Sequence, residues 1–412
     1  MSAATSAPAE LLVARSRRVQ HAGELLELLP SAEYVSSWVR HGAGLVGWGE
    51  VARTETAGAQ RATDASAWWT DFCAHVHVED DVGVPGSGPV AFTSLAFADS
   101  PGSSVLVVPR VVAGRWGEVT WVTELGARRA EEIAPVVAPV GLRYSADSHP
   151  VTRWRAAVET AVLRIHAGEL DKVVLARDLL VDAAGTIDPR FVLTHLAARY
   201  PQCWTFAVDG LVGATPELLV RRIGAHVSSR VLAGTTWPRE GVSERELATQ
   251  LLSSGKDRGE HSYAVTSLVR ALESLCEQVR VREVEVLQLR NVAHLSTTVT
   301  GELADPTTSV LQLAAALHPT AAVGGTPTDV AVALITELEE MDRGRYAGPV
   351  GWIDSRGDGE LGLALRSAEV HGATARLFAG GGIVAESDPD EEVAETDAKF
   401  VPVRDALEGV TG

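Results

Sequence analysis

The chain has 412 residues, a formal net charge of -18 at pH 7, 46% apolar residues and 22% charged residues. This balance is that of a globular protein with a sizeable buried core, and it argues against a disordered chain. The negative charge makes nucleic acid and membrane surfaces poor partners, because both are themselves anionic. An anionic small-molecule substrate remains compatible if cations gather around it.

The N-terminal sequence and the cysteines favour a cytoplasmic protein. The first residues lack the basic and then apolar stretches of a secretory signal, and no run of about 18 apolar residues predicts a membrane span. The three cysteines, Cys73, Cys203 and Cys276, are odd in number and far apart. That spacing argues against a disulfide scaffold or a zinc site and favours a reducing compartment.

Residues 1 to about 145 are expected to be β-rich and irregular. Short apolar runs at residues 105–108 and 119–122 alternate with clusters of glycine, proline and serine. Residues 80–89 (DDVGVPGSGP) are expected to form a loop. No internal repeat or low-complexity linker separates this portion from the rest of the chain.

From about residue 150 the signals for individual elements become sharper. Residues 151–168 have apolar side chains at helical spacing and end at a glycine, and further helices are expected at 244–252 and 257–277. Strands are predicted at 172–180, 204–208, 217–221, 350–354, 359–370 and 374–379, with a turn at 213–216. Grouped strands with helices between the groups predict an α+β fold rather than a repeating βαβ fold.

Lysine is scarce in this sequence. Only three of the 36 basic residues are lysine, namely Lys172, Lys256 and Lys399. A general bias toward arginine explains the scarcity, and chance survival on the surface explains the three positions as well as function does. A functional reading is that a lysine persists where a base is needed, since a buried lysine can lose its proton and arginine effectively cannot.

Glu260 is a candidate ligand for a cation. We expect it in the first turn of the helix that Asp257 opens, where it borders the apolar face. The helix dipole alone also explains an acidic residue at that position.

A second acidic group lies in SDPDEEVAETDAK at residues 387–399. With Ser387 as N-cap, Glu392, Glu395 and Lys399 follow at i, i+3 and i+7 on one face of a helix. Two carboxylates so placed suit a hard cation such as Mg²⁺. Taken alone, the pattern is more often a solvated acidic face.

Two glycine-rich segments, AGGGIV (379–384) and VGGTP (323–327), would let backbone N–H groups approach an anion. Neither fits a Walker loop or a dinucleotide-binding pattern. Ordinary tight turns explain each of them equally well.

Taken together, eight ordered blocks resemble the chorismate-utilising enzymes, a family that includes isochorismate, salicylate, anthranilate and aminodeoxychorismate synthases. The blocks are KVVLAR (172–177), GATPELLV (213–220), LAGT (232–235), KDRGEH (256–261), LHPTAAVGGTP (317–327), DRGRYAGPVGW (342–352), LALR (363–366) and GGGIVAESDPDEEVAETDAK (380–399). The resemblance covers about residues 150–410. It implies one chorismate-binding domain over residues 1–412, with a divergent β-rich portion at about 1–145 and the catalytic motifs at about 150–410.

The resemblance also implies a role for individual residues. Lys172 matches a general base that activates water, and Glu217 matches a general acid that protonates the departing hydroxyl. Glu260 and Glu395 match magnesium ligands, and Glu392 lies near them as a further ligand or a supporting acid. The positions that match substrate-binding groups are Gly213, Thr215, His294, Tyr346, Arg366, Gly380, Gly381, Gly382 and Lys399.

The reaction that the resemblance implies is the Mg²⁺-dependent conversion of chorismate to isochorismate. Water adds at C2 and the C4 hydroxyl leaves, so the enzyme needs a base for the water and an acid for the leaving group. Chorismate is a dianion, so Mg²⁺ would neutralise one carboxylate and Arg366 would grip the other with paired donors. Chorismate is the expected partner, and no obligate protein partner is expected.

Three positions indicate which member of the family the chain resembles. Water-using members carry lysine at Lys172, whereas anthranilate synthases carry glutamine. Ala233 occupies the position at which many aminodeoxychorismate synthases carry a lysine, and Ala322 occupies a position that tends to be threonine in salicylate-forming relatives. These three residues favour a reaction that stops at isochorismate.

Other readings stay open: a salicylate synthase, a subunit that works with a glutaminase partner, and a noncatalytic binding protein. The complete catalytic set argues against the last. Two positions depart from the family pattern: Gly381 replaces a usual alanine, and Pro402 is expected to end or kink the last helix soon after Lys399.

Overall fold

The computed structural model describes residues 12–100, 102–127, 132–145, 150–237, 241–290 and 292–410, and the side chain of Lys256 lies outside the described parts. The helices are α1 (Arg61–Ala74), α2 (Val151–His166), α3 (Pro189–Arg199), α4 (Glu244–Ser253), α5 (Gly255–Glu273), α6 (Val310–Leu317), α7 (Thr328–Glu339), α8 (Pro389–Glu408) and the 3-10 helix η1 (Leu25–Leu28). The strands are β1 (Leu12–Arg18), β2 (Ser36–Arg40), β3 (Ala43–Thr56), β4 (Val76–Asp80), β5 (Val90–Ser94), β6 (Ser104–Trp116), β7 (Val119–Leu125), β8 (Arg143–Ser145), β9 (Lys172–Asp182), β10 (Trp204–Val208), β11 (Leu211–Thr215), β12 (Leu218–Ile223), β13 (His226–Thr236), β14 (Cys276–Val281), β15 (Glu285–Leu289), β16 (Val292–Leu303), β17 (Gly325–Thr326), β18 (Pro349–Asp354), β19 (Gly359–Leu363), β20 (Ser367–His371) and β21 (Thr374–Ile383).

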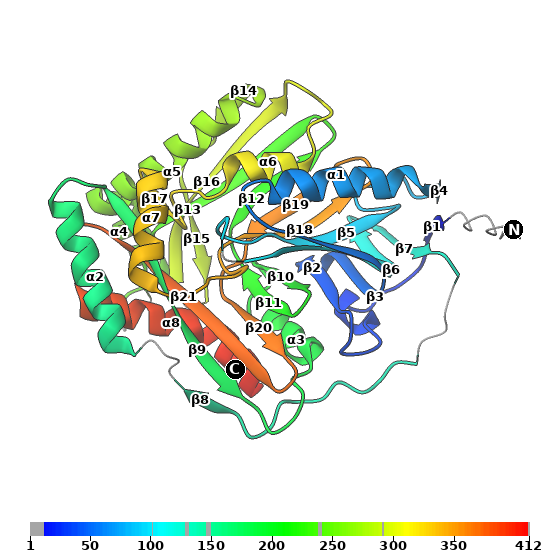
Figure 1. Cartoon of the computed structure of the whole chain (residues 1–412), viewed down its shortest axis with the longest axis horizontal. Coiled ribbons are helices and arrows are strands. Elements are labelled where there is room, and N and C mark those ends of the chain that lie inside the picture. Colours follow the sequence, from blue (N-terminus) through cyan, green and yellow to red (C-terminus); the bar gives the residue numbers. More distant parts are fainter. Residues whose placement is uncertain are drawn as a thin grey trace, which may run out of the picture.

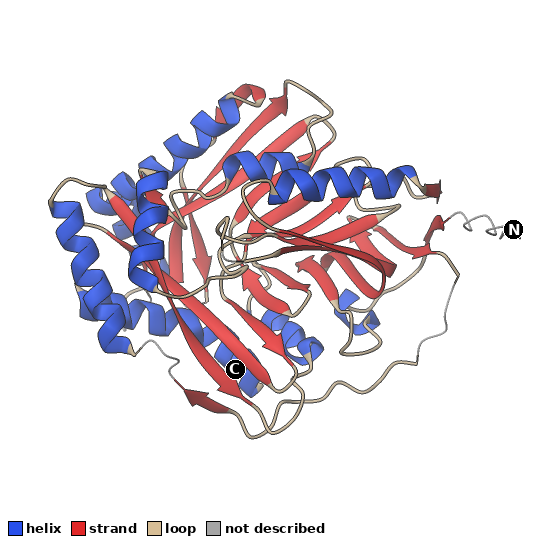
Figure 2. Cartoon of the chain, viewed as in Figure 1, coloured by secondary structure: helices blue, strands red, loops and turns tan. Residues whose placement is uncertain are grey.

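Most of these strands form one continuous series of antiparallel neighbours. The series runs β16, β13, β12, β19, β18, β5, β6, β3, β2, β10, β11, β20, β21 and β9. The helices lie against the outside of the strand layers (Figure 2). The fold is therefore α+β, as the sequence predicts. Within the described residues, no helix combines the length and apolar character that crossing a membrane requires.

Strands from the first 145 residues are built into the middle of this series (Figure 1). β2 pairs with β10, and β5 pairs with β18. A buried side-chain contact crosses the same boundary, because the indole of Trp38 donates a 2.7 Å hydrogen bond to Glu360 Oε2. The proposal that the chain forms a single domain rests on this interleaving.

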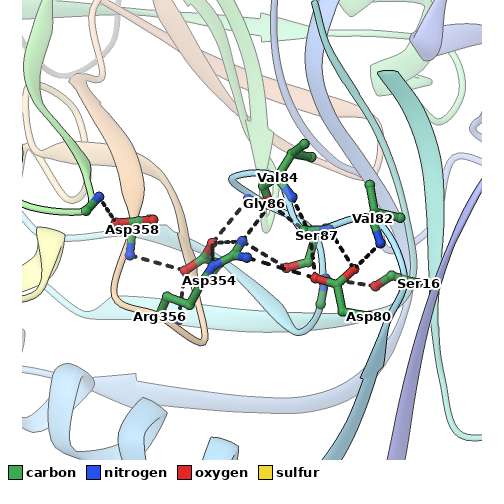
Figure 3. A network of polar contacts seen from close by, with 12 residues as sticks. Ser16, Asp80, Val82, Val84, Gly86, Ser87, Asp354, Arg356 and Asp358 are labelled. Carbon is green, nitrogen blue, oxygen red and sulfur yellow. Dashed lines mark hydrogen bonds and ion pairs between the residues drawn. The ribbon is translucent and has the colours of Figure 1, made fainter. Parts of the chain in front are cut away.

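The predicted loop at residues 80–89 is fixed by a network of polar contacts (Figure 3). Asp354, at the end of β18, accepts hydrogen bonds from the backbone of Gly86 and from the guanidinium of Arg356. Arg356 also donates to the Val84 carbonyl at 2.6 Å. These contacts satisfy the loop's polar groups from the C-terminal half of the chain.

The turn predicted at residues 213–216 is wrong. Gly213 lies within β11, between Phe206 of β10 and Ser367 of β20. A Cβ there would lie 2.7 Å from the Phe206 ring and 2.8 Å from the Arg366 carbonyl oxygen, so close packing within the sheet explains the glycine. The reversal occurs earlier, at Asp209 and Gly210, which both have positive φ.

The strand predicted at residues 359–370 is two strands, β19 and β20. They are separated at Arg366, which has a φ of 50°. Left-handed backbone is uncommon for arginine. Arg366 lies in the short segment between the end of β19 at Leu363 and the start of β20 at Ser367.

Helix α5 begins earlier than predicted. It is capped by Ser254, whose side chain accepts a hydrogen bond from Asp257 N, and its first residue is Gly255. Glu260 therefore lies in the second turn, where the helix dipole explains an acidic residue less well than it would in the first.

Helix α8 also differs from expectation at both ends. Its N-cap is Asp388 and not Ser387. Pro402 does not end it, since the helix continues to Glu408. An interior proline costs about 3 kcal/mol, and burial of neighbouring apolar side chains such as Phe400 and Val403 offsets this.

Candidate active site

A cavity of about 120 Å³ lies where the two ends of the strand series meet. β9 and β21 line it from one end of the series, β13 and β16 line it from the other, and α5 and α8 add side chains. The sequence-predicted residues in its lining are Lys172, Glu217, Glu260, His294, Tyr346, Arg366, Gly380, Gly382, Glu395 and Lys399. Both discriminating alanines, Ala233 and Ala322, line it as well.

Four predicted site residues lie behind the lining. Gly213 packs in the sheet as described above, and Thr215 Oγ1 accepts a 3.2 Å hydrogen bond from the Glu217 backbone N–H. Gly381 lies against Glu392, which accepts a 2.8 Å hydrogen bond from the Ser387 hydroxyl. Of these four residues, Thr215 holds the backbone of a lining residue, Glu217.

Two lysine–carboxylate pairs face the cavity. Lys172 Nζ lies 2.5 Å from Glu260 Oε1, which joins the start of β9 to α5. Lys399 Nζ lies 2.6 Å from Glu395 Oε1 and donates to the Gly380 carbonyl at 2.8 Å. Burial disfavours the charged form of Glu395, but Lys399 and two further nearby cations outweigh it and lower its pKa.

Glu217 has a different environment from the other carboxylates. Its side chain is buried, and burial raises its pKa to about 8 against the opposing influence of Lys172 and Arg230. Its backbone is held on both sides, because its carbonyl accepts from Leu363 N and Arg230 donates to the preceding Pro216 carbonyl. Burial therefore favours the protonated form of Glu217, which is the form that can donate a proton.

The two arginines in the lining have different roles. Arg343 commits its donors to Glu339 and to the carbonyls of Val323 and Val174, so it builds the wall. Arg366 donates no side-chain hydrogen bond anywhere in the described ranges of the chain. It is buried, and burial lowers its pKa; an arginine stays charged nonetheless. A buried, uncommitted guanidinium suits a substrate carboxylate.

His294 and Tyr346 are neutral polar groups in the lining. Burial, followed by the nearby Arg366 and Lys399, lowers the pKa of His294 to about 3. Its Nδ1 shares a 3.0 Å hydrogen bond with Thr235 Oγ1. Burial raises the pKa of Tyr346 to about 12, and its ring stacks on Phe378. Both can therefore form hydrogen bonds with a ligand without adding charge.

The glycines at 380–382 are not in a turn, because they form part of β21 and pair with β9. Their small size leaves room for carboxylates. A Cβ on Gly382 would lie 3.5 Å from Glu260 Oε1, and a Cβ on Gly381 would lie 2.7 Å from Glu392 and 3.9 Å from Glu395. Three carboxylates thus border two consecutive glycines.

This donor set fits a magnesium ion that is shared with a substrate. Mg²⁺ in enzymes is commonly held by one or two carboxylates, several waters and the substrate. Within the ranges that the structure describes, no three acidic, histidine or cysteine side chains lie close enough to hold a metal ion alone. The residues fit the shared arrangement and not an all-protein cage.

Three residues of the site were not predicted from the sequence: Arg343, Thr235 and Arg230. The first two lie within the DRGRYAGPVGW and LAGT blocks, so the family resemblance of these blocks could have indicated them as site residues. Arg230 lies two residues before LAGT, and its contact with Pro216 joins β13 to the segment before β12. That contact depends on strand pairing, which no local pattern reveals.

Comparison with known proteins identifies the family. The sequence model described as chorismate binding enzyme matches residues 121–408. The chain is 42% identical over 261 residues to isochorismate synthase DhbC of Bacillus subtilis, and 41% identical over 264 residues to isochorismate synthase MenF of the same organism. These alignments cover 60% and 62% of this chain, and 65% and 55% of those two proteins, less than two thirds of each.

A solved structure extends the similarity to nearly the whole chain. The structure titled putative 2,3-dihydroxybenzoate-specific isochorismate synthase DhbC, from Bacillus anthracis, superposes with a TM-score of 0.77 at 32% identity. The superposition covers 93% of this chain and 98% of that one. The chain therefore belongs to the chorismate binding enzyme family.

Proposed function

We propose that this enzyme is an isochorismate synthase that isomerises chorismate with Mg²⁺ as cofactor. One observation carries the proposal: a buried carboxyl group, Glu217 in the segment before β12, and a lysine, Lys172 at the start of β9, line one cavity. The names of the Bacillus subtilis relatives support the same activity.

The two residues supply the proton transfers that the reaction needs. Lys172 accepts a proton from the water that adds at C2, and Glu217 donates its proton to the hydroxyl that leaves C4 as water. One water enters and one leaves, so chorismate and isochorismate have the same composition. Because Lys172 begins β9 and Glu217 precedes β12, the two groups reach the ring from different parts of the wall.

The remaining lining binds a dianion. Arg366 is placed to hold one substrate carboxylate with paired donors, and Tyr346 and His294 add neutral hydrogen bonds. Glu260 and Glu395, with Glu392 beside them, would hold Mg²⁺. When bound, the ion would neutralise the other substrate carboxylate and the charge that builds on it in the transition state.

The test of the proposal is product analysis. The purified chain, incubated with chorismate and Mg²⁺, is expected to accumulate isochorismate, with only traces of salicylate and pyruvate near neutral pH. Ala322 lines the cavity without the hydroxyl that salicylate-forming relatives tend to carry. Chromatography identifies the products, and coupling to lactate dehydrogenase detects pyruvate. Stoichiometric pyruvate would instead identify a salicylate synthase.

Metal dependence gives a second prediction. Excess chelator is expected to abolish turnover, and added Mg²⁺ should restore it. Glu395→Gln should remain folded but lose activity, because it keeps the shape and removes the charge of a ligand. Circular dichroism checks the fold and initial rates check the activity. Full turnover in excess chelator would contradict the magnesium assignment.

The pH profile gives a third. The forward rate is expected to fall above about pH 8, because Glu217 acts as an acid only while protonated and its pKa is raised to about 8. Arg230→Met should move this limb to higher pH, since the guanidinium favours the ionised carboxylate. Initial rates between about pH 6 and pH 10 measure the limb. If the alkaline limb of the pH profile does not move in Arg230→Met, Arg230 does not influence the pKa of the group that limits the rate.

We also propose that the enzyme works in the cytoplasm without an obligate protein partner. Its three cysteines, all within the described ranges, are free thiols, which supports a reducing compartment. Activity of the chain purified alone, with no glutaminase subunit added, tests the second part.

A further inference from the structure

We propose that Arg177, on β9, is a positioning residue that fixes the turn of α8 carrying the proposed metal-binding carboxylates. The inference rests on the proposed function in one respect only, the assignment of Glu395 and Glu392 to Mg²⁺. Arg177 itself does not line the cavity.

The guanidinium of Arg177 contacts three groups within one turn of α8. Its Nε donates to Thr396 Oγ1 at 2.8 Å, and its Nη2 donates to Asp397 Oδ1 at 2.5 Å and to the Val393 carbonyl at 3.3 Å. All three acceptors lie between Glu392 and Lys399 in the sequence. They define the position and the rotation of that one turn.

Arg177 and its contact with Thr396 are shielded from water, whereas the side chain of its ion-pair partner Asp397 is 64% exposed. The guanidinium carbon lies 5.7 Å from the ring centroid of Trp154 on α2 and 5.1 Å from that of Phe400 on α8. The arginine is 7% exposed and Thr396 is fully buried. Hydrogen bonds to a charged donor are stronger where water is excluded, and a planar fork fixes direction as well as distance.

Arg177 also connects this turn to the opposite side of the site. On β9 it follows Lys172 by five residues, and it pairs across the ladder with Ala379, next to Gly380. The Gly380 carbonyl accepts the hydrogen bond from Lys399. Through its own strand, β9, and its contacts with α8, Arg177 therefore connects Lys172 and the glycines of β21 to the helical turn that carries Glu392 and Glu395.

This arrangement predicts a specific effect on metal affinity. Side chains that orient metal ligands without touching the metal typically change metal affinity by about 10–100-fold when removed. In Arg177→Met the helix keeps its apolar packing but loses the three directed contacts. We expect the dissociation constant for a divalent ion to rise by about 10–100-fold.

The chain offers a matched control in Arg199. This arginine also ion-pairs with an aspartate of α8, Asp405 at 3.0 Å, and donates to a nearby carbonyl, that of Val410 at 2.7 Å. Arg199 thus contacts the C-terminal end of α8, beyond the turn that carries Glu392 and Glu395. Arg199→Met should lower the melting temperature but leave metal affinity within about twofold of wild type, because the ligand turn keeps its own contacts.

The experiment measures binding of Mn²⁺, as a paramagnetic substitute for Mg²⁺, to the full chain with chorismate present, using the EPR signal of the free ion. Weaker binding in Arg177→Met alone supports the proposal, and equal effects in both variants, or none in Arg177→Met, overturn it. If Arg177→Met does not fold, Thr396→Val removes one acceptor with little change of shape and should still weaken Mn²⁺ binding. Isochorismate formation by wild type is scored separately, so failure of the proposed function is recognised without reference to Arg177.

Discussion

Replacing Glu217 by glutamine is expected to lower kcat for isochorismate formation by a factor of about 10²–10⁴. Glutamine has nearly the same shape and cannot donate a carboxylic proton, so the C4 hydroxyl would have to leave without one. The effect should fall on kcat and not on KM, because Arg366 and the carboxylates of α5 and α8 are unchanged. Initial rates at several chorismate concentrations separate the two parameters.

A second buried carboxylate provides the control for Glu217. Glu360 is 4% exposed against 6% for Glu217, but it accepts from the indoles of Trp38 and Trp204 and does not line the cavity. Glu360→Gln should therefore reduce stability and leave kcat largely intact. If Glu217→Gln keeps more than about a tenth of wild-type kcat, some other group protonates the leaving hydroxyl.

The sequence was most informative where chemistry depends on local spacing. The i, i+3 and i+7 pattern of Glu392, Glu395 and Lys399 predicts one helical face, and in the structure Lys399 does pair with Glu395 one turn away. The helix that carries them is predicted correctly, although its cap is Asp388 and it does not end near Pro402. Caps and interior prolines depend on tertiary packing, which overrides local preference.

The glycines show the opposite case. The sequence predicts a turn at Gly213, and for the segment 380–382 it allows either a tight turn or a backbone that approaches an anion. In the structure they are strand residues that leave space for Phe206, for Glu392 and for Lys172. The requirement comes from neighbours that are distant in the sequence, so composition alone cannot distinguish the two uses.

The ion pairs within the site cannot be predicted from local sequence patterns either, because their partners are also distant in the sequence. Lys172 and Glu260 are 88 residues apart, and Arg177 and Asp397 are 220 apart. The family resemblance brought Lys172 and Glu260 to one site, but it did not predict their ion pair. It also did not select Arg177, although that residue ends the KVVLAR block.

Lys172→Ala is expected to lower kcat by a factor of about 10²–10⁴, because it removes the group that activates water. The structure raises an alternative explanation for such a loss, since Lys172 is also the ion-pair partner of Glu260 at 2.5 Å. An alanine variant cannot distinguish a base from a positive charge that holds a carboxylate in place.

Lys172→Arg makes that distinction. A guanidinium can satisfy Glu260 but stays protonated, so it cannot accept a proton from water. If Lys172 is the base, the arginine variant should be nearly as inactive as alanine. The matched control is Lys399→Arg, in which the second lysine–carboxylate pair is changed in the same way but no proton transfer is assigned; it should keep clearly more activity. Should Lys172→Arg retain most of the wild-type kcat, Lys172 serves as an electrostatic anchor, and another group must activate the water.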